Sequence, residues 1–129
     1  MEGAPPVVYI VDDDVSVRRA LTRLMRSVGL EAVAFASAEA FLQAGLPQRQ
    51  CCLVLDIRLT GMTGLDLLNH LTAAGVSLPV IVITAHDDTQ VRASASNARV
   101  IAYLRKPFDD EALLAAIWRA AGHAPGSPS

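Results

Sequence analysis

The segment Val7–Asp14 reads VVYIVDDD, five apolar residues followed at once by three aspartates. A short run rich in β-branched residues is typical of a buried strand. Similar runs lead to Asp56, to Thr84 and to Lys106, the only lysine of the chain. If these runs are parallel strands of one sheet, their polar ends meet at its carboxyl edge, where open α/β sheets bind ligands.

Composition limits the classes of protein that fit. The chain has 129 residues, of which 52% are hydrophobic and 19% charged, as expected for one globular domain. Its formal net charge of -2 offers no basic surface for nucleic acid, so we expect no direct DNA contact by this segment. No apolar stretch is long enough for a membrane span.

The cysteines and the N-terminus indicate a cytoplasmic setting. Cys51 and Cys52 are neighbours in an apolar run, where side chains point to opposite faces, so we expect buried, reduced thiols. The first six residues lack the pattern of a signal peptide.

Strand and helix patterns alternate five times along the chain. Strands are predicted over Val7–Val11, Ala32–Ala36, Cys51–Leu55, Leu78–Ile83 and Val100–Leu104. Helices are predicted over Ser16–Val28, after an N-cap at Ser37, over Gly64–Ala74, over Asp87–Ala98, and from Asp109 or Asp110 to about Gly122. This (βα)5 pattern predicts an α/β fold with a doubly wound parallel sheet. Residues 7–122 would form the domain, with residues 1–6 as an extension and 123–129 as a disordered tail or the start of a linker.

The aspartate cluster predicts a divalent cation. Carboxylates that converge at a strand end repel one another, and Mg²⁺, or Mn²⁺ in its place, would relieve that repulsion. We expect Asp13 and Asp56 to be direct ligands and Asp12 to act directly or through water. Asp14 has the alternative role of capping the next helix.

The other strand ends suggest phosphoryl chemistry. The Asp56 carboxylate can attack phosphorus if a cation neutralises the incoming group. Lys106 would supply a second positive charge, and Thr84 a hydrogen bond to a phosphoryl oxygen. Tyr103 fits ordinary packing as well as a switching role.

These motifs together resemble the receiver domain of two-component response regulators. The resemblance rests on Val11-Asp12-Asp13, on Leu55-Asp56 with Gly64 following, on Ile83-Thr84-Ala85 and on Lys106-Pro107-Phe108, and it covers about Val7 to Ala121. Details around Thr84 and Lys106 are most similar to the FixJ-like subgroup.

The resemblance implies a flavodoxin-like fold with strand order 2-1-3-4-5. It implies Asp56 as the phospho-acceptor from a sensor histidine kinase, and Mg²⁺ held by Asp13, Asp56 and the backbone carbonyl of Arg58. It also implies a switch pair of Thr84 and Tyr103, and a cis peptide before Pro107. Such a protein catalyses its own phosphorylation and dephosphorylation and is not a turnover enzyme.

Three positions depart from the family pattern. Thr60 replaces the usual proline, so we expect a more mobile loop after Asp56. Arg99 replaces a glycine and Ala102 a frequent acidic residue. The last two weaken the surface formed by the fourth helix, the fifth strand and the fifth helix, through which the family signals and through which a homodimer is possible.

Two other functions fit parts of the pattern. In a HAD-like phosphatase, Asp12 would be the nucleophile of a D-x-D motif, although Ser16 is not the expected residue and the chain has no room for a cap. A degenerate receiver would only bind partners. The output, whether transcriptional through a further DNA-binding domain or that of a single-domain regulator, does not follow from these residues.

Overall fold

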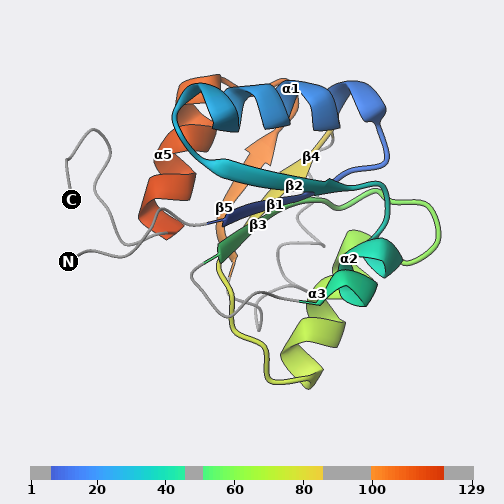
Figure 1. Cartoon of the computed structure of the whole chain (residues 1–129). Helices are drawn as coiled ribbons and strands as arrows, with labels where there is room; N and C mark the ends of the chain where they lie inside the picture. Colours follow the sequence, from blue (N-terminus) through green and yellow to red (C-terminus); the bar gives the residue numbers. More distant parts are fainter. Residues whose placement is uncertain (1–6, 46–50, 86–99, 121–129) are drawn as a thin grey trace.

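The computed structural model describes residues 7–45, 51–85 and 100–120 (Figure 1). The predicted helix over Asp87–Ala98, Arg99, the extension 1–6 and the tail 123–129 lie outside the described residues.

The described elements form a three-layer α/β structure (Figure 1). The strands are β1 (Val7–Val11), β2 (Glu31–Phe35), β3 (Cys51–Asp56), β4 (Val80–Thr84) and β5 (Val100–Arg105). The helices are α1 (Val15–Ser27), α2 (Ala38–Ala44), α3 (Gly64–Ala73) and α5 (Asp110–Ala120). All paired strands are parallel and their order is β2-β1-β3-β4-β5, which confirms the predicted flavodoxin-like topology.

Alternation along the strands divides the core into two layers. On β1, Val7, Tyr9 and Val11 pack with the residues beneath α2 and α3, while Val8 and Ile10 pack beneath α1 and α5. Successive strand side chains point to opposite faces, so both faces need apolar cover. The central strands therefore read as continuous apolar runs.

The expectation of burial on both faces holds for the central strands only. β1 and β4 are buried throughout, and β3 is buried except for Cys51 at its start. β2 and β5 lie at the two edges of the sheet and are mostly half-buried or exposed. β5 also contains a register shift relative to β4, since Val80 and Ile81 pair with Val100 and Ala102.

Helix caps explain where the helices begin. The side chains of Asp14, Ser37 and Thr63 accept hydrogen bonds from the backbone of the first turns of α1, α2 and α3, which satisfies amides that have no helical partner. The cap at Ser37 is confirmed. β2 begins one residue earlier than predicted, and β4 is shifted by one to two residues so that it includes Thr84.

No helix in the described part of the chain is long and apolar enough to cross a membrane.

Candidate functional site

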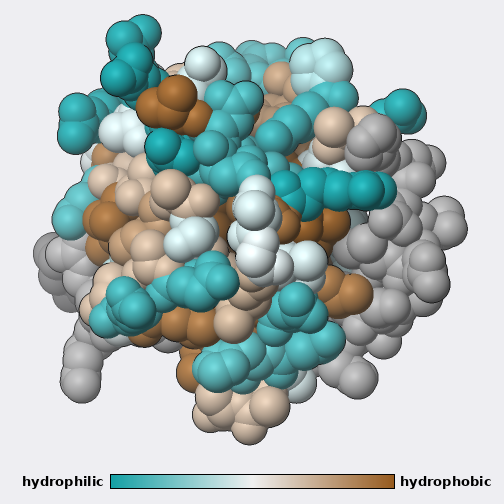
Figure 2. All heavy atoms as spheres, turned by 90° about the vertical axis from the view of Figure 1, so that its right-hand side faces the viewer, coloured by the Kyte–Doolittle hydropathy of each residue, from teal (hydrophilic) through white to brown (hydrophobic). Residues whose placement is uncertain are grey.

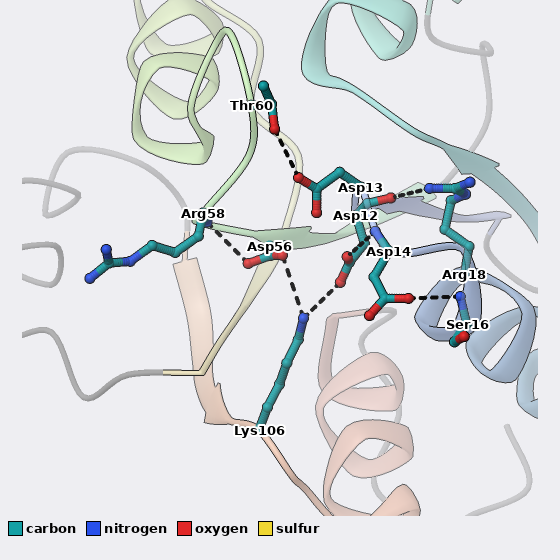
Figure 3. Close-up of polar contacts among 9 residues, drawn as sticks. All are labelled: Asp12, Asp13, Asp14, Ser16, Arg18, Asp56, Arg58, Thr60 and Lys106. Atoms are coloured by element: carbon teal, nitrogen blue, oxygen red, sulfur yellow. Dashed lines mark hydrogen bonds and ion pairs between the residues drawn. The ribbon is translucent and has the colours of Figure 1, made fainter.

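The carboxyl ends of β1, β3, β4 and β5 bring the predicted residues to one edge of the sheet. Asp12 directly follows β1, Asp56 ends β3, and Thr84 ends β4. Lys106 directly follows β5 and reaches between Asp12 and Asp56 (Figure 3). Figure 2 looks at the side of the molecule on which β1 ends and α1 begins, and hydrophilic residues gather across this face with apolar ones between them.

Asp12 is fully buried, and both of its carboxylate oxygens have partners. Oδ1 accepts a hydrogen bond of 2.9 Å from the backbone amide of Asp14, and Oδ2 accepts one of 2.9 Å from Lys106 Nζ. A buried carboxylate is stable only when its charge is compensated in this way. The cation that compensates the charge of Asp12 in this structure is therefore the ammonium group of Lys106.

Asp56 is also buried, with only 5% of its surface exposed. Its Oδ1 accepts a hydrogen bond of 3.0 Å from the Arg58 amide, and its Oδ2 lies 3.4 Å from Lys106 Nζ. Burial raises the pKa of Asp56 above its usual value and the charge of Asp12 adds to this, while the Arg58 amide and Lys106 oppose it. The carboxylate is thus poorly solvated, and its charge is only partly compensated by its neighbours.

Lys106 is held by two carboxylates. Burial alone would lower the pKa of Lys106, but the hydrogen bond and charge of Asp12, followed by those of Asp56, raise it above the usual value. The ammonium group is therefore charged at neutral pH. The Lys106–Pro107 peptide bond is cis, as the family resemblance implies.

Asp13 is exposed, and Figure 3 shows its carboxylate joined to Thr60 and not to Lys106. Its Oδ2 accepts a hydrogen bond of 3.2 Å from the hydroxyl of Thr60. One ligand oxygen each from Asp12, Asp13 and Asp56 lies within 4.8 Å of the others, and these three form the only group of at least three potential metal-ligating residues among the described residues. Mg²⁺ binds carboxylate oxygens and keeps part of its water shell. The cluster suits this ion because one of its three carboxylates is exposed to solvent.

Arg58 contributes its main chain to the site. Its amide binds Asp56, while its side chain points away from the three carboxylates (Figure 3). The backbone of Arg58 is therefore fixed beside Asp56.

Thr84 and Tyr103 lie on neighbouring strands. Tyr103 pairs with Val82, two residues before Thr84, so the side chains of Tyr103 and Thr84 point to the same face of the sheet. Thr84 is buried and Tyr103 is half-buried. The backbone carbonyl of Thr84 accepts a hydrogen bond of 2.6 Å from the Lys106 amide, which joins the strand ends that carry both residues.

The third aspartate is a helix cap. Asp14 Oδ1 accepts a hydrogen bond of 2.8 Å from the Ser16 amide at the start of α1, as the alternative reading predicted. Asp14 is also absent from the carboxylate cluster.

Two further contacts support the site; that of Arg18 had no signal in the sequence, whereas Gly64 belongs to the motif that follows Asp56. The guanidinium group of Arg18 donates a hydrogen bond of 2.7 Å to the Asp12 carbonyl, which fixes the main chain beside the cluster. The Gly64 amide donates to the Ile57 carbonyl at 3.0 Å, and a Cβ on Gly64 would lie 2.7 Å from the Asp56 carbonyl oxygen. Only glycine allows α3 to begin this close to the end of β3.

Comparisons with known proteins agree with this geometry. The family model for the response regulator receiver domain matches residues 8–118. Nodulation protein W of Bradyrhizobium diazoefficiens is 46% identical over 86% of this chain and 49% of its own length. Transcriptional regulatory protein FixJ of Azorhizobium caulinodans is 43% identical over 85% of this chain and 52% of its own length.

Among solved structures, the response regulator StyR has a TM-score of 0.85 and 44% identity, over 91% of this chain and 59% of its own. This chain thus spans about half the length of the curated relatives it matches. The family match, together with the strand order and the cluster at the sheet edge, shows that the chain belongs to the response regulator receiver domain family and resembles the FixJ-like members.

Proposed function

We propose that this domain takes a phosphoryl group from a phosphohistidine of a sensor histidine kinase onto Asp56, in a Mg²⁺-dependent reaction. The observation that carries the proposal is the position of the buried Asp56 carboxylate, which lies between two further carboxylates and the ammonium group of Lys106. Receiver domains as a family bind Mg²⁺ at an acidic pocket, and they are in general not turnover enzymes.

In the proposed reaction an Asp56 oxygen forms a bond to phosphorus. The bond between phosphorus and the histidine nitrogen breaks, and its electron pair stays on the imidazole. Mg²⁺, or Mn²⁺, held by Asp13, Asp56 and the Arg58 carbonyl, with Asp12 directly or through water, would neutralise phosphoryl oxygens. The ammonium group of Lys106 lies 3.4 Å from Asp56 Oδ2, and this short distance supports a contact of Lys106 with the transferred group.

The proposed response starts at Thr84 and Tyr103. The hydroxyl of Thr84 would bond a phosphoryl oxygen, and Tyr103, on the same face of the sheet, would move into the space that Thr84 leaves. This local change would bias a two-state surface that includes β5 and α5 and controls the output. A full reversal of the population requires roughly 5.5 kcal/mol of preference for the phosphorylated state.

The remaining parts of the proposal concern the whole protein. Relatives with names of transcriptional regulators support an output in transcription. A homodimer would use the surface that contains β5 and α5. A cytoplasmic location is supported by the free thiols of Cys51 and Cys52. Direct contact of this segment with nucleic acid is not part of the proposal, because its net charge is -2.

The test uses acetyl phosphate with Mg²⁺ and intact-mass measurement. A single phosphoryl adduct on the wild type that is absent from Asp56→Asn supports the proposal. An adduct that persists in Asp56→Asn would refute Asp56 as the acceptor. A wild type that neither forms an adduct nor binds Mg²⁺ would be the degenerate receiver that only binds partners.

The HAD-like phosphatase is not supported. Both oxygens of Asp12, its required nucleophile, are bound by Lys106 and the Asp14 amide, and Asp12 is fully buried. The family match and the strand order also belong to the receiver domain. Steady hydrolysis of phosphate monoesters that is lost in Asp12→Asn and kept in Asp56→Asn would reverse this conclusion.

A further inference from the structure

Thr60 joins the loop after Asp56 to the exposed member of the carboxylate cluster. Its hydroxyl donates a hydrogen bond of 3.2 Å to Asp13 Oδ2, across a sequence separation of 47 residues (Figure 3). The two residues lie in different loops, because Asp13 follows β1 and Thr60 follows β3. This hydrogen bond therefore connects the loop after β3 to the side chain of Asp13.

The same loop is fixed on both sides of Thr60. Before it, the Arg58 amide binds Asp56 Oδ1 at 3.0 Å. After it, the Met62 amide donates a hydrogen bond of 3.1 Å to Oε2 of Glu39 on α2. These two hydrogen bonds hold the backbone on either side of Thr60. They do so although position 60 lacks the proline that would fix its φ angle.

The hydroxyl leaves Asp13 able to bind a cation. An ionised carboxylate has about four lone-pair sites, and Thr60 occupies one of them. Asp13 is exposed, so its side chain would otherwise rotate freely in solvent. A hydrogen bond to a metal-ligating carboxylate fixes its orientation and commonly raises metal affinity.

We propose that Thr60 is a positioning residue for the cation site. Its hydroxyl holds the Asp13 carboxylate towards Asp12 and Asp56, and it couples cation binding to the order of residues 57–63. The inference rests on the proposed function, because it assumes that Asp13 is a Mg²⁺ ligand. It does not depend on phosphoryl transfer.

The first test is Mg²⁺ affinity, measured by isothermal titration calorimetry on the full chain. Thr60→Val removes the hydroxyl and keeps the shape, and we expect Mg²⁺ to bind about 3- to 10-fold more weakly, at or below the lower end of effects seen for residues that orient metal ligands. Thr60→Ser restores a hydroxyl and should return the affinity to within about 2-fold of the wild type. Thr72→Val is the matched control, since the Thr72 hydroxyl bonds the Leu68 carbonyl on α3 and should leave the affinity unchanged.

The second test is amide hydrogen exchange of residues 57–63. Mg²⁺ should slow exchange in the wild type and Thr60→Ser, and should do so less in Thr60→Val at equal saturation. Unchanged or tighter Mg²⁺ binding by Thr60→Val would overturn the inference, as would equal protection of the loop in both proteins. If Mg²⁺ binds and Asp13→Asn abolishes binding while Thr60→Val has no effect, this inference fails and the proposed cation site stands. If the wild type binds no Mg²⁺, the proposed function fails as well.

Discussion

Lys106 lies closer to Asp12 than to Asp56. Its Nζ is 2.9 Å from Asp12 Oδ2 and 3.4 Å from Asp56 Oδ2, and Asp12 is the more deeply buried of the two. The lysine thus neutralises the carboxylate that water cannot reach and leaves Asp56 only partly compensated. In the proposed reaction, Asp56 would therefore be the carboxylate that gains from a cation and a phosphoryl group, while Asp12 keeps its contact with Lys106.

Removal of the lysine charge should destabilise the fold. Lys106→Met leaves two buried carboxylates without their common cation, and we expect a loss of about 2 kcal/mol in the free energy of unfolding. This value is below that for fully buried pairs because 23% of the Lys106 side chain is exposed. Urea denaturation of the wild type and of Lys106→Met measures this difference in the free energy of unfolding. The raised pKa means that this contribution is complete below the ordinary value of 10.5, so it is present at neutral pH and lost as pH rises through the higher folded-state value.

Mg²⁺ and a neighbouring cation provide the controls for that variant. Millimolar Mg²⁺ should restore part of the lost stability, because a bound ion relieves the same repulsion. Arg105→Met removes an exposed charge next to Lys106 and should change stability by about 0.5 kcal/mol or less. Equal effects of the two substitutions would contradict the role given to Lys106.

Replacement of the proposed acceptor should stabilise the domain without Mg²⁺. Burial raises the pKa of Asp56, so the folded state binds its proton more tightly and the ionised carboxylate opposes folding at neutral pH. We expect Asp56→Asn to raise stability by on the order of 1 kcal/mol at pH 7, or roughly 2–8 °C in melting temperature. The gain should shrink as pH falls through the raised folded-state pKa, and it should vanish below the ordinary value of 3.8, where the wild-type carboxyl is protonated in both states.

Asp13→Asn is the comparison for this measurement. Asp13 is exposed, so its charge costs less in the folded state, and its replacement should change the melting temperature less than Asp56→Asn does. A melting temperature of Asp56→Asn at or below that of the wild type at pH 7 would show that the hydrogen bonds of Asp56 outweigh its burial.

The third aspartate should matter for the helix and not for the chemistry. Asp14→Ala removes the cap of α1 and should cost about 1 kcal/mol of stability, and Asp14→Ser should recover most of it. Thermal denaturation gives the cost, and the acetyl phosphate reaction should proceed to the same extent in both variants. Loss of the phosphoryl adduct in a folded Asp14→Ala variant would show that Asp14 takes part in phosphorylation.

Gly64 should be intolerant of even one methyl group. A Cβ there would lie 2.7 Å from the Asp56 carbonyl oxygen and from the Ile57 Cα, so β3 and α3 must separate, and we expect Gly64→Ala to cost about 2–3 kcal/mol. It should also slow phosphorylation, because the displaced backbone carries Asp56. At Gly75 the φ angle is +73° and no atom lies within 4 Å of the added Cβ, so Gly75→Ala should cost only about 1 kcal/mol and leave phosphorylation intact. Similar kinetics in the two variants would speak against the tight contact at Gly64.

Much of the fold followed from local pattern. The apolar runs before Asp12, Asp56 and Thr84 predicted β1, β3 and β4 because a strand buried on both faces needs apolar residues at every position. The patterns at β2 and β5 also predicted strands within one residue of their bounds, but these strands are only partly covered because they lie at the sheet edges. Strand ends shifted by one or two residues, since register is set by the neighbouring strand.

The site was predictable as a set of residues but not as a set of contacts. The sequence by itself determined that carboxylates, a hydroxyl and an ammonium meet at one edge, because parallel strands place their carboxyl ends together. Only the tertiary structure decided the pairing, Lys106 with Asp12 and Thr60 with Asp13, across separations of 94 and 47 residues. Such contacts depend on the strand order, on the depth to which each carboxylate is buried and on the path of the loops, and none of these is encoded in a local run of residues.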